Sequence, residues 1–557
     1  MHRTLLICLL SIALFSCKQY DYDTIIRNGM VYDGNGGAPY KADIGIIKDT
    51  IAFIGDLSKA NAKNETDAMG KAVSPGFINM LSWSPVSLIE DGRSMGELKE
   101  GVTLEVFGEG ESMGPLNEKM QQDMQQDQPL FKYKVAWKTL GEYMQWLEKK
   151  GISCNVASFV GATTIRTNII GEDNRDPTAV ELDSMKLLVK QAMEEGALGV
   201  GSSLIYPPAF FAKINELIEL CKAAAPYGGG YISHMRSEGN KLEQAVEELI
   251  TIAREAKVHG EIYHLKAAGI ANWPKMDSVI KRVERARKEG VDIAANMYTY
   301  TAGATGMTAA MPPSLQDGGF GKLWTRLQDK NIRAETVKAM KTNATDWENL
   351  YYGAGSADKV LLLGFRRDSL FKYIGKTLGE VARIRHTSPE DAAIDLIIQD
   401  SSRVDVAYFL MSEENVKKQV ALPWVSFGSD AASMATEGKF LKQSTHPRAY
   451  GNFTRVIGHY SRDEKIISLP EAIRKLSKLA ATSLHINKRG ELKPGYFADI
   501  LIFDPATVND KASYEKPHQY SEGMLHVWVN GVQVLKNGAH TLAMPGRFVK
   551  GPGYKGN

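Results

Sequence analysis

The sequence predicts an α/β protein: a (β/α)8 barrel of the TIM type with a small β-sandwich domain and an insertion between strands seven and eight. Two observations carry this prediction. Eight short apolar runs alternate with amphipathic helical stretches, and β-rich segments stand at both ends of the chain. Alternating strands and helices are typical of a parallel sheet, and eight repeats close that sheet into a barrel. With 557 residues, 43% hydrophobic and 24% charged, the chain is too apolar for wholesale disorder.

Residues 1–17 are typical of an export signal with a lipobox. Arg3 precedes an apolar run from Leu5 to Phe15, which is too short to span a bilayer. The run ends in the letters LFSC at Cys17, which resemble a bacterial lipobox, where the Cys is lipidated. A plain signal peptide with an incidental Cys is the alternative. We expect an exported bacterial lipoprotein of the cell envelope that contacts the membrane only through a lipid on Cys17.

The small β-sandwich domain is predicted from both ends of the chain, over residues 22–74 and 490–545. The first segment alternates short apolar runs with a turn-rich stretch of Asp, Gly and Asn. Near the C-terminus, Phe497–Phe503 and His526–Val534 have the same strand-like pattern. Two β segments at opposite ends of a chain are expected to pair beside whatever lies between them.

The barrel is predicted over residues 75–489. Helical stretches such as Leu242–Ala256 carry apolar residues at the 3–4 spacing of an amphipathic helix. The gap before the eighth strand exceeds the length of one crossover, so we expect an inserted lobe at about residues 301–357. The eight expected strands are Gly76–Leu81, Val102–Phe107, Asn155–Val160, Leu198–Ser202, Gly230–Ser233, Glu261–Tyr263, Asp292–Met297 and Trp424–Ser429.

Polar side chains follow several of these strands at their C-terminal ends, where such barrels collect their chemistry. Glu109 and Glu111 follow the second strand. His234 and His264 end the fifth and sixth strands, and Asp430 ends the eighth. Two imidazoles and a carboxylate with one open position are a known catalytic zinc arrangement. Such a metal activates water and polarises a carbonyl, while a neighbouring Asp can pass a proton to a leaving nitrogen.

Nine short motifs occur in a fixed order along the chain. Each is weak alone, but together they resemble the amidohydrolase superfamily, and within it the N-acyl-D-amino-acid deacylase (D-aminoacylase) group, over about residues 22–555. The motifs are Ser74–Ile78, Gly101–Thr103, Gly196–Val200, Tyr206–Pro208, Ser233–Glu238, Tyr263–Lys266, Gly428–Asp430, His446–Gly451 and Lys493–Asp499.

The resemblance implies one Zn²⁺, or another divalent metal, per chain. His234 and His264 match the two His ligands of the tightly held metal. The group often places a Cys after the second strand; this chain offers Glu109 or Glu111 there, and Glu109 fits the position better. A single Zn-bound hydroxide is expected to attack the amide carbonyl, with Asp430 as general acid and base.

Four further residues are implied to meet the substrate. Tyr298 matches a Tyr that polarises the scissile carbonyl, and Arg448 matches an Arg that holds the substrate carboxylate in a bidentate grip. Alternatively, Tyr298 is a packed rim aromatic and Arg448 forms a structural ion pair. Tyr206 and Arg236 lie in two of the motifs and are expected to bind substrate, a small N-acyl-D-amino acid or related amide. The net charge of +2 gives no general attraction to nucleic acid.

The chain departs from the superfamily at the end of the first strand. His-x-His is usual there, but residues 79–83 read NMLSW. Gly161-Ala162 stands where Gly-His is common, and Asn296 stands where an Asp is usual. Three functions therefore remain open: a one-metal deacylase, a catalytically degenerate lipid-anchored binding protein, or another hydrolase of cyclic amides or dipeptides. Retention of both strand-end His, the Asp and the Arg favours the first.

Overall fold

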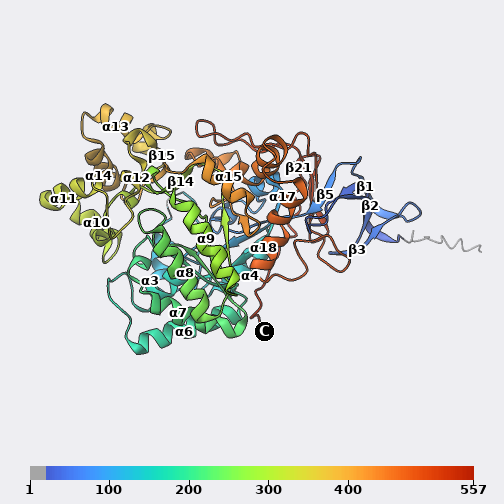
Figure 1. The fold of residues 1–557 in the computed structure, drawn as a ribbon, viewed down its shortest axis with the longest axis horizontal. Coiled ribbons are helices and arrows are strands. Elements are labelled where there is room, and N and C mark those ends of the chain that lie inside the picture. Colours follow the sequence, from blue (N-terminus) through green and yellow to red (C-terminus); the bar gives the residue numbers. More distant parts are fainter. Residues whose placement is uncertain (1–19, 129, 557) are drawn as a thin grey trace, which may run out of the picture.

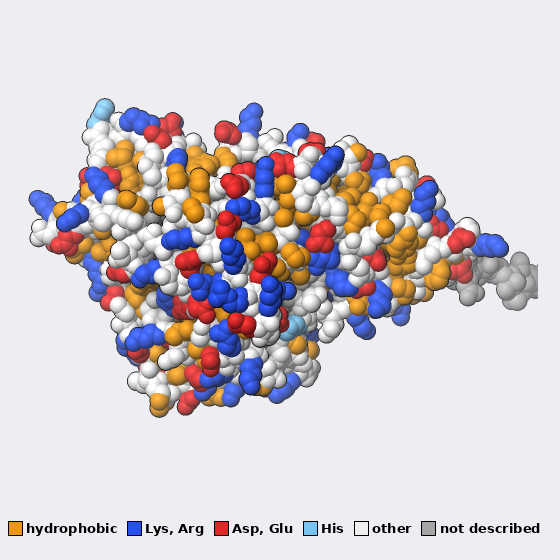
Figure 2. Space-filling view, viewed as in Figure 1, with side chains coloured by type: hydrophobic (Ala, Val, Ile, Leu, Met, Phe, Trp, Pro, Cys, Tyr) orange, Lys and Arg blue, Asp and Glu red, His pale blue; other side chains and the backbone are white. Residues whose placement is uncertain are grey.

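The computed structural model describes residues 20–128 and 130–556, so the expected export signal and Cys17 lie outside the described residues. The described chain has three parts along its long axis (Figure 1): a β domain at one end, a barrel in the middle and a helical lobe at the other end. Acidic and basic side chains are interspersed over the face shown in Figure 2, as the small net charge suggests. No helix in the described ranges is long and apolar enough to cross a membrane.

The β domain is one sheet built from both ends of the chain. Its nine strands are β1 (Tyr22–Val31), β2 (Tyr40–Ile47), β3 (Thr50–Gly55), β4 (Ala62–Asp67), β5 (Ala72–Pro75), β18 (Ile500–Phe503), β19 (Met524–Val529), β20 (Val532–Lys536) and β21 (Ala539–His540). The two ends meet where β5 pairs antiparallel with β18, with Val73 opposite Ile502. Ile26, Ile44 and Trp528 are buried in its apolar core, so segments more than 400 residues apart form one domain.

The predicted barrel is confirmed, with a parallel strand at each of the eight expected positions. The strands are β6 (Phe77–Asn79), β7 (Val102–Phe107), β8 (Asn155–Ser158) with β9 (Val160–Gly161), β10 (Gly199–Ser203), β11 (Gly230–His234), β12 (Gly260–Ile262), β13 (Ile293–Met297) and β17 (Val425–Phe427). The third strand is interrupted at Phe159, so β8 pairs with β7 and β9 with β10. The ring closes where the Met80 N–H donates to the Phe427 carbonyl at 3.2 Å and the Asp430 N–H to the Leu81 carbonyl at 2.9 Å.

Helices cover the outside of the barrel because each presents one apolar face to the strands. In α8, Val246, Leu249 and Ala253 are buried at the 3–4 spacing. A capping box at Thr178 begins α6. The helices outside the lobe are α1 (Ser87–Glu90), α2 (Met95–Glu100), α3 (Glu118–Gln126), α4 (Leu140–Lys150), α5 (Ala162–Ile169), α6 (Ala179–Glu194), α7 (Ile214–Ala224), α8 (Leu242–Ala256), α9 (Lys275–Lys288), α15 (Glu413–Ala421), α16 (Arg448–Arg455), α17 (Leu469–Leu476) and α18 (Lys478–Ser483).

The inserted lobe is longer than the expected residues 301–357. It contains the strands β14 (Ala302–Gly306), β15 (Val360–Gly364) and β16 (Asp405–Phe409) and the helices α10 (Phe320–Arg326), α11 (Lys330–Met340), α12 (Leu350–Ala354), α13 (Leu378–Arg385) and α14 (Pro389–Asp400). The lobe ends only at β16 because that strand returns to pair antiparallel with β14, with Ala302 opposite Phe409. Its helices pack around a separate apolar core that includes Leu362, Val381 and Ile397.

Candidate active site

A cavity of about 400 Å³ lies at the C-terminal ends of the barrel strands. Charged and polar side chains from β7, β11, β12 and β17 or the loops after them line it on the barrel side. Thr305, Phe320 and Leu350 of the lobe line the opposite side. The cavity therefore lies between barrel and lobe, where this fold places its chemistry.

Three buried side chains on the barrel side come together as a cluster of metal-ligand type. Oε1 of Glu109 lies 3.1 Å from Nδ1 of His234 and 3.0 Å from Nε2 of His264. One donor atom from each residue lies within 4.8 Å of the other two, and all three residues are buried. Among the described residues, the structure thus brings Glu109, His234 and His264 together and leaves Glu111 on the cavity wall outside this cluster.

Local backbone geometry explains why Glu109 rather than Glu111 joins the two His. Gly108 follows β7 with φ +101°, a conformation that residues with a side chain disfavour. A Cβ on Gly108 would lie 2.3 Å from the carbonyl oxygen of Phe159, so only glycine fits. This turn aims the next residue, Glu109, at the ends of β11 and β12. His264 follows β12 with a positive φ of 32°, a strained backbone of the kind found at functional sites.

Opposite charges hold the cluster together. Burial and Lys266 lower the pKa of His264, but Glu238 and Glu109 outweigh them and raise that pKa to about 9. Burial raises the pKa of Glu109, but the neighbouring His264 and His234 overcome it and hold that pKa well below its ordinary value. Glu238 supports the cluster from behind, since its Oε1 lies 2.9 Å from Nδ1 of His264 and 2.5 Å from Nζ of Lys266.

These residues fit a divalent metal ion. The donor set of two imidazoles and one carboxylate suits zinc, and three protein ligands leave the open position that a catalytic zinc needs. Nε2 of His234 is buried and has no hydrogen-bond partner among the described residues, although Oε2 of Glu238 lies 3.8 Å away. The nitrogen of His234 that faces Oε1 of Glu109 is Nδ1, at 3.1 Å, so Nδ1 is the atom that would join the ion and Nε2 lies on the Glu238 side. The residues that would hold the metal are Glu109, His234 and His264.

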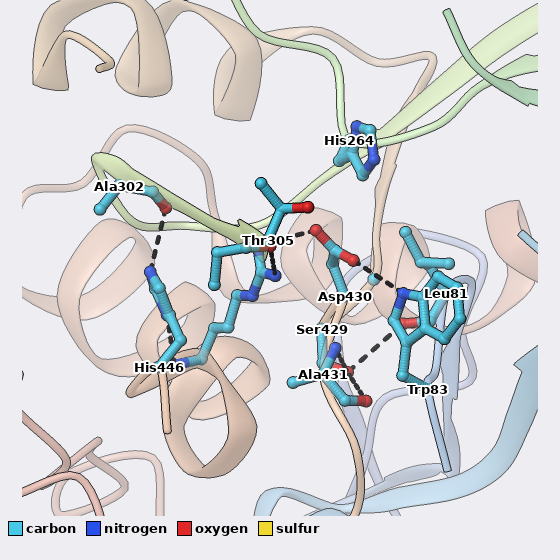
Figure 3. A network of polar contacts seen from close by, with 12 residues as sticks. Leu81, Trp83, His264, Ala302, Thr305, Ser429, Asp430, Ala431 and His446 are labelled. Carbon is cyan, nitrogen blue, oxygen red and sulfur yellow. Dashed lines mark hydrogen bonds and ion pairs between the residues drawn. The ribbon is translucent and has the colours of Figure 1, made fainter. Parts of the chain in front are cut away.

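Asp430 lies beside this cluster at the end of β17. Its backbone has φ +50°, a second strained residue at the cavity. Its Oδ2 lies 2.8 Å from Nη1 of Arg448, and its Oδ1 accepts a hydrogen bond of 3.1 Å from Nε1 of Trp83 (Figure 3). Burial raises the pKa of Asp430, against the opposing effects of Arg448 and His264. A carboxylate of this kind can accept a proton and return it.

Two buried donors, on Tyr298 and Arg448, point to a ligand between barrel and lobe. The Tyr298 hydroxyl and Nε of Arg448 are buried and have no hydrogen-bond partner among the described residues. The guanidinium of Arg448 lies 4.4 Å from the Tyr298 ring centroid, and Nζ of Lys266 lies 5.5 Å from it. Burial raises the pKa of Tyr298 well above its ordinary value, so the phenol stays neutral and can donate. Two cations and one neutral donor suit a carboxylate.

The structure separates the two remaining candidates for substrate binding. Tyr206 lines the cavity, where its hydroxyl lies 2.7 Å from Oγ1 of Thr305. The expectation for Arg236 is wrong. Arg236 pairs with Glu248 of α8 at 2.9 Å and donates to the carbonyls of Phe210 and Ala212, so it lies outside the cavity lining. Its donors are used to fix the loop after β10 to α8.

Three residues at the cavity have no role predicted from the sequence. Trp83 donates to both Glu109 and Asp430. Lys266 stands two residues after His264, and both line the cavity. Its position two residues after a strand-end His could therefore have indicated that Lys266 belongs to the site. Arg403, which lies between α14 and β16 in the lobe, also lines the cavity, and nothing in the sequence near it signals that position.

Known proteins resemble this chain along almost its whole length. The amidohydrolase family profile matches residues 424–535. A D-aminoacylase from Alcaligenes xylosoxydans xylosoxydans is 30% identical over 536 residues, covering 95% of this chain and 97% of that protein. The structure of an N-acyl-D-glutamate deacylase from Bordetella bronchiseptica, complexed with zinc and a phosphonate inhibitor, matches with a TM-score of 0.79 and 27% identity over 95% of this chain and 99% of that one.

A D-aminoacylase structure also matches, with a TM-score of 0.78 and 30% identity over 95% of this chain and all of that one. It is described as having a binuclear metal center with one-metal activation and second-metal attenuation. Full-length similarity, the barrel and the Glu–His–His cluster all agree. The chain belongs to the amidohydrolase family, in the D-aminoacylase group, and is a metal-dependent amide hydrolase.

Proposed function

We propose that this chain is an N-acyl-D-amino-acid deacylase that works with a single zinc ion. The observation that carries the proposal is the placement of two sets of groups in one cavity. Glu109, His234 and His264 form the metal-ligand cluster, Asp430 lines the same cavity, and the buried Arg448 is ion-paired with Asp430 at 2.8 Å. The names of the relatives support the substrate class, since they include a D-aminoacylase and an N-acyl-D-glutamate deacylase.

The metal ligands fix where the reaction takes place. Glu109, His234 and His264 would hold a divalent ion, which would supply water activation and polarisation of the scissile carbonyl at this place. Glu238 supports this arrangement, because it contacts the Nδ1 side of His264 and so leaves Nε2 facing Glu109. Second carboxylates of this kind orient imidazole ligands and raise their basicity.

Asp430 moves the proton. In amide hydrolysis a C–O bond to water forms, the C–N bond breaks, and one water proton ends on the leaving nitrogen. Asp430 accepts that proton as water attacks and donates it to the nitrogen as the amine leaves. Its carboxylate is held from two sides, by Arg448 at 2.8 Å and by Trp83 at 3.1 Å, so its position is fixed before substrate arrives.

Arg448, Tyr298 and Lys266 recognise the substrate carboxylate. Charge-assisted hydrogen bonds to a carboxylate are about twice as strong as neutral ones. The guanidinium and the phenol lie together, with the ring centroid 4.4 Å from the guanidinium carbon. A carboxylate held there and a carbonyl held at the metal ligands fix two points of the substrate, and the cavity wall sets the third. Three fixed points distinguish one enantiomer from the other.

Turnover of a matched substrate panel tests this function. N-acetyl derivatives of several D-amino acids and their L-enantiomers are incubated with the zinc-loaded protein, and the released amine is measured. We expect release from at least one D-substrate, its L-enantiomer to be much slower, and the activity to disappear with a chelator and return with zinc. Tight binding of a D-substrate that is recovered intact would instead establish a binding protein.

We also propose that the chain is an exported lipoprotein anchored through Cys17. The support is the short apolar run that ends in LFSC. Expression of the full-length chain beside Cys17→Ala, followed by membrane fractionation, tests this. The wild type is expected in the membrane fraction and the variant in the released fraction, and unchanged fractionation of the variant would contradict the proposal.

A further inference from the structure

Trp83 stands between two carboxylates on the barrel side of the cavity. Its indole Nε1 donates to Oε2 of Glu109 at 3.0 Å. It also donates to Oδ1 of Asp430 at 3.1 Å (Figure 3). Glu109 is thus shared, because its Oε1 faces the two His and its Oε2 faces the indole. An indole nitrogen carries a single N–H, which the two carboxylates share here, and it has no lone pair for a metal. One neutral donor serves two acidic groups that would together attract a cation.

The segment that carries Trp83 offers no other ligand at this place. Residues 79–83 read NMLSW, where the superfamily usually has His-x-His. Leu81 is fully buried and apolar. Asn79 is buried too, and its amide is used by Glu97 and by Ser429. The first strand therefore presents only the indole to Glu109 and Asp430.

We propose that the indole of Trp83 takes the place of a second metal ion between Glu109 and Asp430. The chain then holds one divalent ion, and excess zinc does not attenuate it. This inference rests on the proposed function, because it concerns the metal count of that same site. It would distinguish this chain from the related D-aminoacylase, which is described as having a binuclear center with second-metal attenuation.

Trp83 is also a positioning residue for Asp430. The two carboxylate oxygens of Asp430 have different partners, Trp83 on Oδ1 and Arg448 on Oδ2. Without the indole N–H, the carboxylate is free to turn about its Cβ–Cγ bond while the ion pair remains. Loss of that donor alone is therefore expected to lower kcat more than it raises KM.

Metal stoichiometry tests the inference without any substrate. The full chain and the variants Trp83→His and Trp83→Phe are equilibrated with excess zinc, desalted and measured by elemental mass spectrometry. We expect about one zinc in the wild type and about two in Trp83→His, where an imidazole completes three ligands with Glu109 and Asp430. Trp83→Phe is the matched control: it also lacks the indole but adds no ligand, and it is expected to stay at about one.

We expect the Trp83 variants to fold like the wild type. Trp83 is 41% exposed to the cavity, so its replacement removes little from the core, and circular dichroism checks each variant. About two zinc ions in the wild type, or about one in a folded Trp83→His, would overturn the inference. Failure of the proposed deacylase activity is separate, since it appears as absent turnover of D-substrates whatever the metal count. Added zinc is further expected to slow Trp83→His and to leave the wild-type rate unchanged.

Discussion

Two sides of one barrel mouth carry different chemistry, although both follow the ends of parallel strands. The side built by β7, β11 and β12 brings Glu109, His234 and His264 within ligand distance of one another. The side built by β6 and β17 presents Trp83 and Asp430, joined by an indole N–H. The first side is suited to binding a metal ion, and the second is suited to proton transfer.

On the proposed function, this barrel keeps its hydrolytic chemistry without the His-x-His pair. Glu109 belongs to both sides, since each of its oxygens serves one of them. A neutral donor on the second side leaves the charge of Glu109 available to the first. Retention of Glu109, His234, His264 and Asp430 at one cavity therefore favours a one-metal enzyme over a degenerate barrel, although His-x-His is absent.

The largest expected effect comes from breaking the metal-binding side. Glu109→Gln keeps the shape of the side chain but removes its charge. We therefore expect the variant to lose its zinc, and its kcat/KM to fall on the order of 10³-fold or more. Elemental analysis and turnover of the best D-substrate measure both. The matched variant Glu111→Gln lies on the same wall outside the cluster and is expected to keep its zinc. If Glu111→Gln lost its zinc while Glu109→Gln kept it, the metal ligand would be Glu111 and not Glu109.

The second effect isolates the proton-transferring side. Asp430→Asn removes the proton acceptor but leaves Glu109, His234 and His264 in place, so we expect kcat to fall about 10²- to 10⁴-fold while the zinc content is unchanged. Steady-state kinetics beside elemental analysis separates the two readouts. Turnover within tenfold of the wild type would contradict the assignment of Asp430 as general acid and base.

The smallest effect concerns substrate recognition. Arg448→Lys keeps the charge but loses the planar guanidinium, and a hydrogen bond to a charged group contributes about 1.5–3 kcal/mol. We expect a loss of roughly 10- to 100-fold in kcat/KM, mainly through KM. The matching N-acyl-D-amino acid amide, which lacks the carboxylate, serves as the control substrate. An equal loss on both substrates would mean that Arg448 does not bind the substrate carboxylate and only forms a structural ion pair with Asp430.

Much of this architecture could be predicted because it depends on local patterns. Each barrel strand is a short apolar run, so all eight positions were found from the sequence. Strand ends converge in a barrel, so His234, His264 and Asp430 could be placed near one another without any contact information. The end of the inserted lobe could not be placed, because β16 is defined by its distant partner β14.

Parts of the site depended on geometry that the sequence does not reveal. The choice between Glu109 and Glu111 is made by the positive φ of Gly108. Arg236 was misplaced because its partner, Glu248, lies one helix later on α8 and draws its side chain away from the cavity. The role of Trp83 was missed because an indole between two carboxylates follows no ligand pattern.

A second cluster of His and Glu residues serves as an internal control for the metal site. Glu413, His459 and Glu464 also place donor atoms within 4.8 Å of one another, but they are only partly buried. Lys417 lies 2.7 Å from Glu464, and the Tyr460 hydroxyl donates to Glu413 at 2.9 Å. These carboxylates already have a cation and a donor. We therefore expect this surface cluster to hold no zinc.

The zinc content of the purified protein shows whether Glu109, His234 and His264 hold one metal ion. Elemental mass spectrometry after zinc addition and desalting is run on the wild type, on His234→Ala/His264→Ala and on His459→Ala. We expect about one zinc per chain in the wild type and in His459→Ala, and none in the double variant. No zinc in the wild type, or one zinc retained by the double variant and lost from His459→Ala, would contradict this expectation.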